Sequence, residues 1–119
     1  MTLYGSGKSG YIGKRRSPSA VTQITTADTA VTISATSGQI TTATLTAIAG
    51  AEHVFVVTNT SVKTTSVVTA SMSTYTGTGT PIISIGALTA GTFTVTISNV
   101  HASTALTLTM VINFVVTNI

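Results

Sequence analysis

Hydrophobic and polar residues alternate with a period of two along most of the chain. The alternation is strictest over residues 92–98, where Phe93, Val95 and Ile97 are each flanked by threonine or serine. Because successive side chains of a β-strand point to opposite faces of its sheet, this segment is predicted to be a strand with one buried face. The same alternation covers residues 106–117. At about 3.3 Å per residue that segment would span roughly 40 Å, so we expect it to bend or to reach beyond its own domain.

Six weaker runs of the same kind precede these two strands. They cover residues 20–25, 30–35, 39–45, 53–58, 66–72 and 81–85. From residue 36 on, turn signals containing glycine or asparagine separate them. Eight short strands at this spacing predict an all-β domain, a single antiparallel β-sandwich or barrel. Residues 42–51 are rich in alanine, so a short helix remains open there.

Composition supports strands and a single folded domain. The 119 residues include 28 threonines and 13 valines, which are β-branched and favour a pleated sheet. There is no cysteine, so disulfides and thiolate metal sites are excluded. Apolar runs stay far below the roughly 20 residues that a membrane-spanning helix needs, and the first residues lack the apolar stretch of a secretory signal. We expect no membrane association.

Charge divides the chain into two parts. Four of the five basic residues, Lys8, Lys14, Arg15 and Arg16, lie in the first sixteen positions, whereas positions 17–119 carry only Asp28, Glu52 and Lys63. The net charge of +3 is therefore +4 on an N-terminal segment and −1 on the rest. Glycine and serine alternate there with Tyr11, Ile12 and other anchors. We predict a flexible basic arm over residues 1–19, which binds an acidic partner, and a β-domain over residues 20–119.

Residues that could perform acid–base chemistry are few. Asp28, Glu52, His53 and His101 are the only side-chain carboxylates and imidazoles, and no G-x-S-x-G, H-x-x-x-H or H-x-H pattern occurs. We therefore predict no enzymatic activity, no catalytic residue, no metal and no cofactor, and we interpret both histidines as turn residues. Residues 7–9, Gly-Lys-Ser, lack the earlier glycine, the strand and the helix that a phosphate-binding P-loop requires.

A nucleic-acid partner is disfavoured as well. The run Lys14-Arg15-Arg16 could contact phosphates, but four charges are few and the body offers no basic face on which a nucleic acid could continue. With three Phe, three Tyr and no Trp, aromatic residues are too sparse for a base-stacking platform.

The passages at residues 20–25, 29–33, 37–42, 55–59, 90–100 and 112–116 resemble a set of small β-rich virion proteins of tailed bacteriophages. Such proteins resemble capsid decoration (cement) proteins or, in some phages, the domains of fibres and other virion appendages. The resemblance extends over residues 20–119 and does not include the arm. It implies a homotrimeric β-module on the outer surface of the capsid, located in the virion, with the arm laid across neighbouring subunits of the major capsid protein. The residues then expected to contact the capsid are Lys8, Tyr11, Ile12, Lys14, Arg15 and Arg16.

Two alternatives remain open. One is a tail fibre, appendage or host-receptor-binding module, although the absence of tryptophan and the scarcity of acids disfavour a carbohydrate site. The other is an adhesin module with a Lys–Asn isopeptide bond, for which Lys63, Glu52 and either Asn59 or Asn99 would be the candidates. We expect no such bond.

Overall fold

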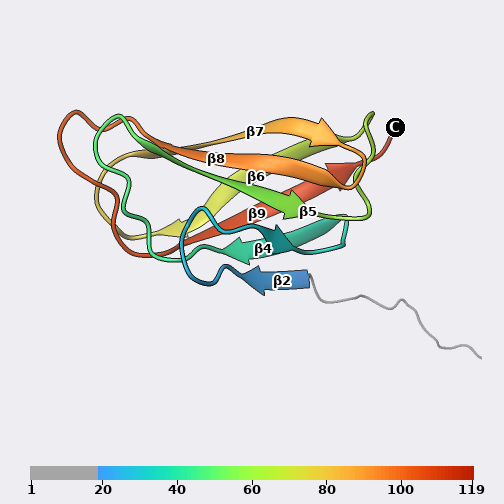
Figure 1. The fold of residues 1–119 in the computed structure, drawn as a ribbon, viewed down its shortest axis with the longest axis horizontal. Helices are drawn as coiled ribbons and strands as arrows, with labels where there is room; N and C mark the ends of the chain where they lie inside the picture. The colour runs from blue at the N-terminus through green and yellow to red at the C-terminus, as the bar shows by residue number, and fades with distance from the viewer. Residues whose placement is uncertain (1–18) are drawn as a thin grey trace, which may run out of the picture.

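Residues 19–119 form a β-sandwich of two four-stranded sheets (Figure 1). The structure, a computed structural model, describes residues 19–119, and within that range it contains strands and no helix. The predicted all-β fold with eight strands is confirmed. The predicted basic arm lies outside the described residues, except that Ser19 already belongs to the first strand.

Each sheet combines two strands from before residue 60 with two strands from after it. The first sheet has the order β2 (Ser19–Thr22), β4 (Ser37–Thr41), β9 (Met110–Thr117) and β6 (Val67–Tyr75). The second has the order β3 (Val31–Thr32), β5 (Glu52–Thr58), β8 (Thr92–Asn99) and β7 (Pro81–Thr89). Among the strands of residues 19–119, only β7 and β8 are both consecutive and paired, through a two-residue turn in which Gly91 has a φ of 93°.

The sequence predicted an antiparallel sandwich or barrel, but two of the strand pairs in residues 19–119 are parallel. β2 pairs with β4 and β3 with β5 in parallel, whereas the other four pairs are antiparallel. The path of the chain is the cause. From β2 to β5, consecutive strands alternate between the two sheets. As a result β4 runs in the same direction as β2 in the first sheet, and β5 in the same direction as β3 in the second. Alternation in the sequence shows which side of a strand is buried, but it does not show which strand pairs with it or in which direction.

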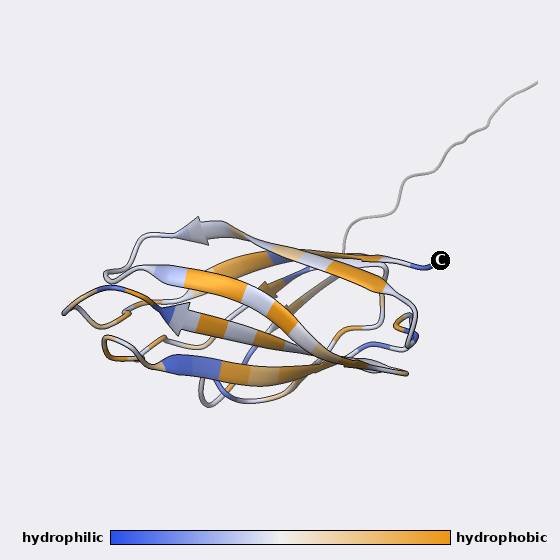
Figure 2. Cartoon of the chain, turned by 90° about the horizontal axis from the view of Figure 1, so that it is seen from above, coloured by the Kyte–Doolittle hydropathy of each residue, from blue (hydrophilic) through white to orange (hydrophobic). Residues whose placement is uncertain are grey.

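The core lies between the sheets and consists of the inward-facing residues that alternation predicted. Phe93, Val95 and Ile97 on β8 are at most 1% exposed. On β9, Ile112 and Phe114 are 0% and 2% exposed, and the ring centroids of Phe93 and Phe114 lie 5.8 Å apart. Figure 2 shows the resulting alternation of hydrophobic and less hydrophobic positions along the strands.

Two segments near the core differ from what the sequence suggested. The short helix left open over residues 42–51 does not form: residues 42–48 have no regular secondary structure and residues 49–50 form a turn. The Leu45 N–H donates to the Leu108 carbonyl, and the Leu106 N–H donates to the Ala47 carbonyl. The predicted strand over residues 106–117 begins only at Met110, because Leu108 has a φ of 64° and interrupts it. The expected bend in this long segment therefore occurs at Leu108, and Leu106 is still buried at 1% exposure.

Candidate functional site

A cleft opens between the loop after β2 and the segment after β4. Its volume is about 590 Å³. Eight of its thirteen lining residues are threonines, and Asp28 is the charged residue among them. The thirteen are Thr22, Gln23, Thr25, Thr26, Ala27, Asp28, Thr41, Thr42, Ala43, Thr44, Thr46, His53 and Thr109.

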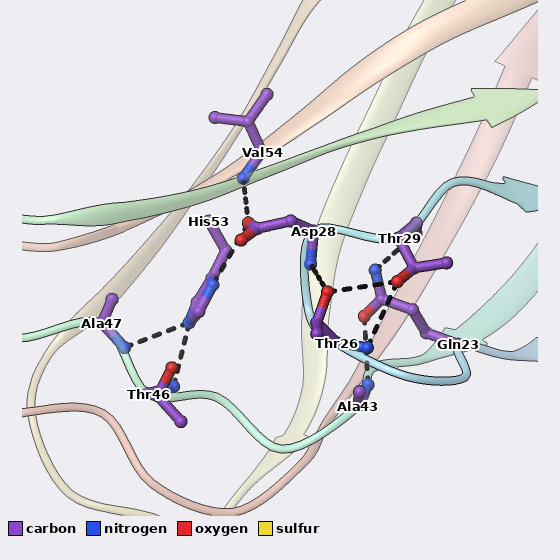
Figure 3. A network of polar contacts seen from close by, with 9 residues as sticks. All are labelled: Gln23, Thr26, Asp28, Thr29, Ala43, Thr46, Ala47, His53 and Val54. Atoms are coloured by element: carbon purple, nitrogen blue, oxygen red, sulfur yellow. Dashed lines mark hydrogen bonds and ion pairs between the residues drawn. The ribbon is translucent and has the colours of Figure 1, made fainter.

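Gln23 joins the two walls of this cleft (Figure 3). Its side chain is 3% exposed; its Nε2 donates to the Thr29 carbonyl at 2.7 Å, and its Oε1 accepts from the Ala43 N–H at 3.0 Å. Within the loop itself, the Thr29 hydroxyl accepts from the Thr26 N–H at 3.2 Å. A buried amide with both ends satisfied holds its partners in fixed positions, so the shape of the cleft depends on Gln23.

Asp28 and His53 form a second connection at the same site (Figure 3). One carboxylate oxygen, Oδ1, lies 3.3 Å from His53 Nδ1 and accepts from the Val54 N–H at 3.1 Å. On the other side of the ring, Nε2 accepts from the N–H groups of Thr46 and Ala47 at 2.9 and 3.1 Å. Two donors directed at Nε2 require its lone pair, so these hydrogen bonds assign the ring proton to Nδ1, which donates it to Asp28.

An Asp–His pair is also two thirds of a hydrolytic triad, but this pair lacks the geometry for that role. A general base needs a free lone pair within reach of a substrate or nucleophile proton. Here the lone pair of Nε2 is taken up by backbone donors, and His53 is only 6% exposed. The side chain instead joins the loop at Asp28, the segment after β4 and the start of β5.

The interpretation of the histidines as turn residues is wrong for His53 and correct for His101. His53 is an inward-facing residue of β5, opposite Ile97 of β8. His101 follows β8, and its Nδ1 accepts from the N–H groups of Ser103 and Thr104 at 3.1 and 3.0 Å, which closes a loop.

We predict that His53→Phe lowers the free energy of unfolding by about 2–3 kcal/mol, because it leaves two backbone N–H groups without an acceptor in a largely buried position. Asp28→Asn is the matched control: its side chain is 60% exposed, and the amide oxygen can still accept from Val54. Urea denaturation followed by circular dichroism measures both. A His53→Phe protein no less stable than Asp28→Asn would show that the ring contributes only its volume.

Two asparagines perform a similar task at opposite ends of the sandwich. Asn59 follows β5 and is 0% exposed; its Nδ2 donates to the Ala35 carbonyl at 2.7 Å, and its Oδ1 accepts from Ala35 and Ser61. Asn99 ends β8 at 1% exposure. Sequence reasoning placed both in turns and missed their burial. Each asparagine occupies the next inward-facing position after two buried apolar residues at alternate positions along the chain. That register was the signal from which the burial of both asparagines could have been predicted.

Asn99 makes four hydrogen bonds with three segments. Nδ2 donates to the carbonyls of Ala47 and Thr104 at 3.0 and 2.8 Å, and Oδ1 accepts from the N–H groups of Thr80 and His101 at 3.2 and 3.1 Å. The side-chain nitrogens of both asparagines are thus occupied by backbone carbonyls, which gives no support to an isopeptide bond at either one.

The six residues expected to contact a partner, Lys8, Tyr11, Ile12, Lys14, Arg15 and Arg16, lie outside the described residues. Glu52 and Lys63 are exposed. Within residues 19–119 no three His, Cys, Asp or Glu side chains come together in a way that could hold a metal ion.

No helix in the described part of the chain is long and apolar enough to span a membrane. Comparisons of the chain with protein-family models, with curated proteins and with solved structures find no match.

Proposed function

We propose that this chain is a non-enzymatic structural protein of a tailed-bacteriophage particle, a capsid decoration protein on the outer capsid surface. The observation that supports this function best is the distribution of charge. Four basic side chains precede a sandwich in which residues 64–119 contain no Asp, Glu, Lys or Arg. Such a body lacks the charged surface that normally keeps small domains apart, and it is suited to a molecule that works within an assembly.

The two parts of the chain have different tasks in this proposal. Lys8, Lys14, Arg15 and Arg16 bind acidic surface of the major capsid protein, while Tyr11 and Ile12 fill apolar gaps between its subunits. The sandwich associates with copies of itself into a homotrimer. Three arms on one trimer bind with high avidity, because the second and third contacts form at high effective concentration.

Stabilisation of the shell follows from mass action. A ligand that binds the closed shell and not its free subunits shifts the equilibrium toward the shell by the free energy of binding. A chain that bridges neighbouring subunits therefore stabilises the particle without any chemical step, and the buried Nε2 of His53 is consistent with a structural role.

The threonine-lined cleft favours a second candidate, a receptor-binding module of a fibre or appendage. Eight threonines and the 60% exposed Asp28 could form hydrogen bonds with a carbohydrate. The lining residues include no Phe, Tyr or Trp side chain on which a sugar ring could stack. This candidate therefore ranks below capsid decoration.

Cryo-electron microscopy of the particle that contains this chain tests the proposed function. We expect density for the sandwich at many symmetry-equivalent sites on the shell, with residues 1–19 running along capsid subunits. A few copies confined to the tail or to one vertex would contradict decoration and support the fibre or receptor-binding alternative.

A further inference from the structure

The inward-facing side chains of β6 and β7 are much less covered than those of the strands beside them. Six apolar residues are concerned, and we call them the open seam: Val68, Ala70, Met72, Ile83, Ile85 and Leu88. Met72 illustrates the contrast, because it is 40% exposed although it pairs with Ile112 of β9, which is 0% exposed. Ile83 likewise is half-buried opposite Ile97, which is 0% exposed.

The open seam follows one side of the sandwich. β6 and β7 are the last strands of their sheets, they contact each other, and residues 76–80 connect them (Figure 1). The opposite side ends in β2 and β3, of four and two residues, which also contact each other. There the inward-facing Val31 of β3 is 6% exposed and Val21 of β2 is half-buried. Among residues 19–119, the core is therefore better covered on the side of β2 and β3 than on the side of β6 and β7.

The four strands β6 to β9, which carry and flank the open seam, contain no charged side chain. β6, β7 and their neighbours β8 and β9 all fall within residues 64–119, which lack Asp, Glu, Lys and Arg. On the outer faces of the same two edge strands, Val67 and Ile82 are 47% and 52% exposed and extend the apolar surface. A charged partner would lose its hydration here without gaining a counter-charge.

We propose that the open seam is the surface through which copies of this chain associate, each copy covering the seam of another. This inference rests on the proposed function, in which the sandwich associates with itself, and it assigns that association to a particular surface. A second copy is the partner whose surface matches, because it presents the same uncharged apolar side chains. In the proposed function the basic arm binds the acidic surface of the capsid. The open seam is apolar and uncharged, so it needs a different, apolar partner.

Contact through side chains fits the strands better than addition of one strand to another. The ladder of β6 shifts register between Met72 and Thr74, and that of β7 between Gly86 and Thr89, where Ala87 has a φ of 50°. Bulges of this kind interrupt the hydrogen-bonding edge and hinder edge-to-edge pairing. Copies that pack seam against seam instead bury the half-exposed apolar side chains in a shared core.

Sedimentation velocity of the full chain without particles tests the proposal. We expect the wild type to sediment at a multiple of the 12.0 kDa chain mass. Met72→Glu should raise the dissociation constant at least tenfold, because each copy then brings a carboxylate into an apolar contact. Ile82→Glu, at a position that faces outward, should also raise the dissociation constant. Circular dichroism checks that each variant is folded. Ile24→Glu is the matched control, since Ile24 is 70% exposed in the loop between β2 and β3.

The outcomes separate this proposal from the proposed function. A monomeric wild type at hundreds of micromolar, or folded seam variants that associate as well as Ile24→Glu, would overturn the open seam as the interface. If such a protein still occupied the shell at many sites, decoration would stand without the seam. Conversely, an oligomer dissociated by Met72→Glu but absent from the shell would support the seam and refute decoration.

Discussion

Replacing Asn99 with alanine is expected to lower the free energy of unfolding by about 3–4 kcal/mol, because four backbone groups lose a partner at a site that is 1% exposed. Its amide joins the segment after β4 at Ala47 to the loops at Thr80 and at residues 101–104. The Ala47 carbonyl keeps its hydrogen bond from the Leu106 N–H. Among the described residues, the groups left without a partner are the N–H groups of Thr80 and His101 and the carbonyl of Thr104. For a domain of this size, such a loss lowers the thermal midpoint by roughly 15 °C.

Thermal and urea denaturation of the full chain measure this effect. Asn113→Ala is the matched control: Asn113 lies on the outer face of β9 and is exposed, so its replacement should change stability by less than about 0.5 kcal/mol. Asn99→Asp keeps the accepting Oδ1 and loses both hydrogen bonds that Nδ2 donates. Its stability therefore measures the contribution of the donated bonds apart from that of the accepted ones. Equal stability of Asn99→Ala and Asn113→Ala would refute the role assigned to the Asn99 amide.

Deletion of residues 1–16 is expected to abolish occupancy of the capsid. All four basic side chains of the arm are lost, and with them the linked contacts of the three arms, so the apparent affinity should fall by at least about 100-fold. Stability and self-association should stay unchanged, because the strands and the open seam lie within residues 19–119. Binding of purified protein to undecorated particles, followed by sedimentation of the particles, measures the loss.

Two further variants separate the contributions within the arm. Replacing Lys8, Lys14, Arg15 and Arg16 with glutamine removes the charge, and replacing Tyr11 and Ile12 with alanine removes the apolar anchors. Binding through charge should weaken as salt rises in the wild type and lose that salt dependence in the glutamine variant. Full occupancy by the deleted chain would refute attachment through the arm.

The sequence alone determined the fold class and most of the strands. Alternation over residues 92–98 and 53–58 places the buried side chains of β8 and β5 correctly, because side-chain direction in a strand is a local property with a period of two. It also placed turns after Asn59 and Asn99, and it showed where the charges lie. The basic arm was defined by sequence as well, and its role stays a prediction, since the described residues begin at Ser19.

The tertiary structure alone decided which segments meet. The parallel pairs of β2 with β4 and β3 with β5, the cleft between the loop after β2 and the segment after β4, and the hydrogen bonds of His53 and Asn99 all join residues far apart in the chain. A polar side chain is buried only where distant backbone groups satisfy it, and local pattern does not contain that information. The open seam has the same origin: the sequence predicted strands over residues 66–72 and 81–85, but whether another layer covers Val68 and Ile83 depends on how the two sheets end.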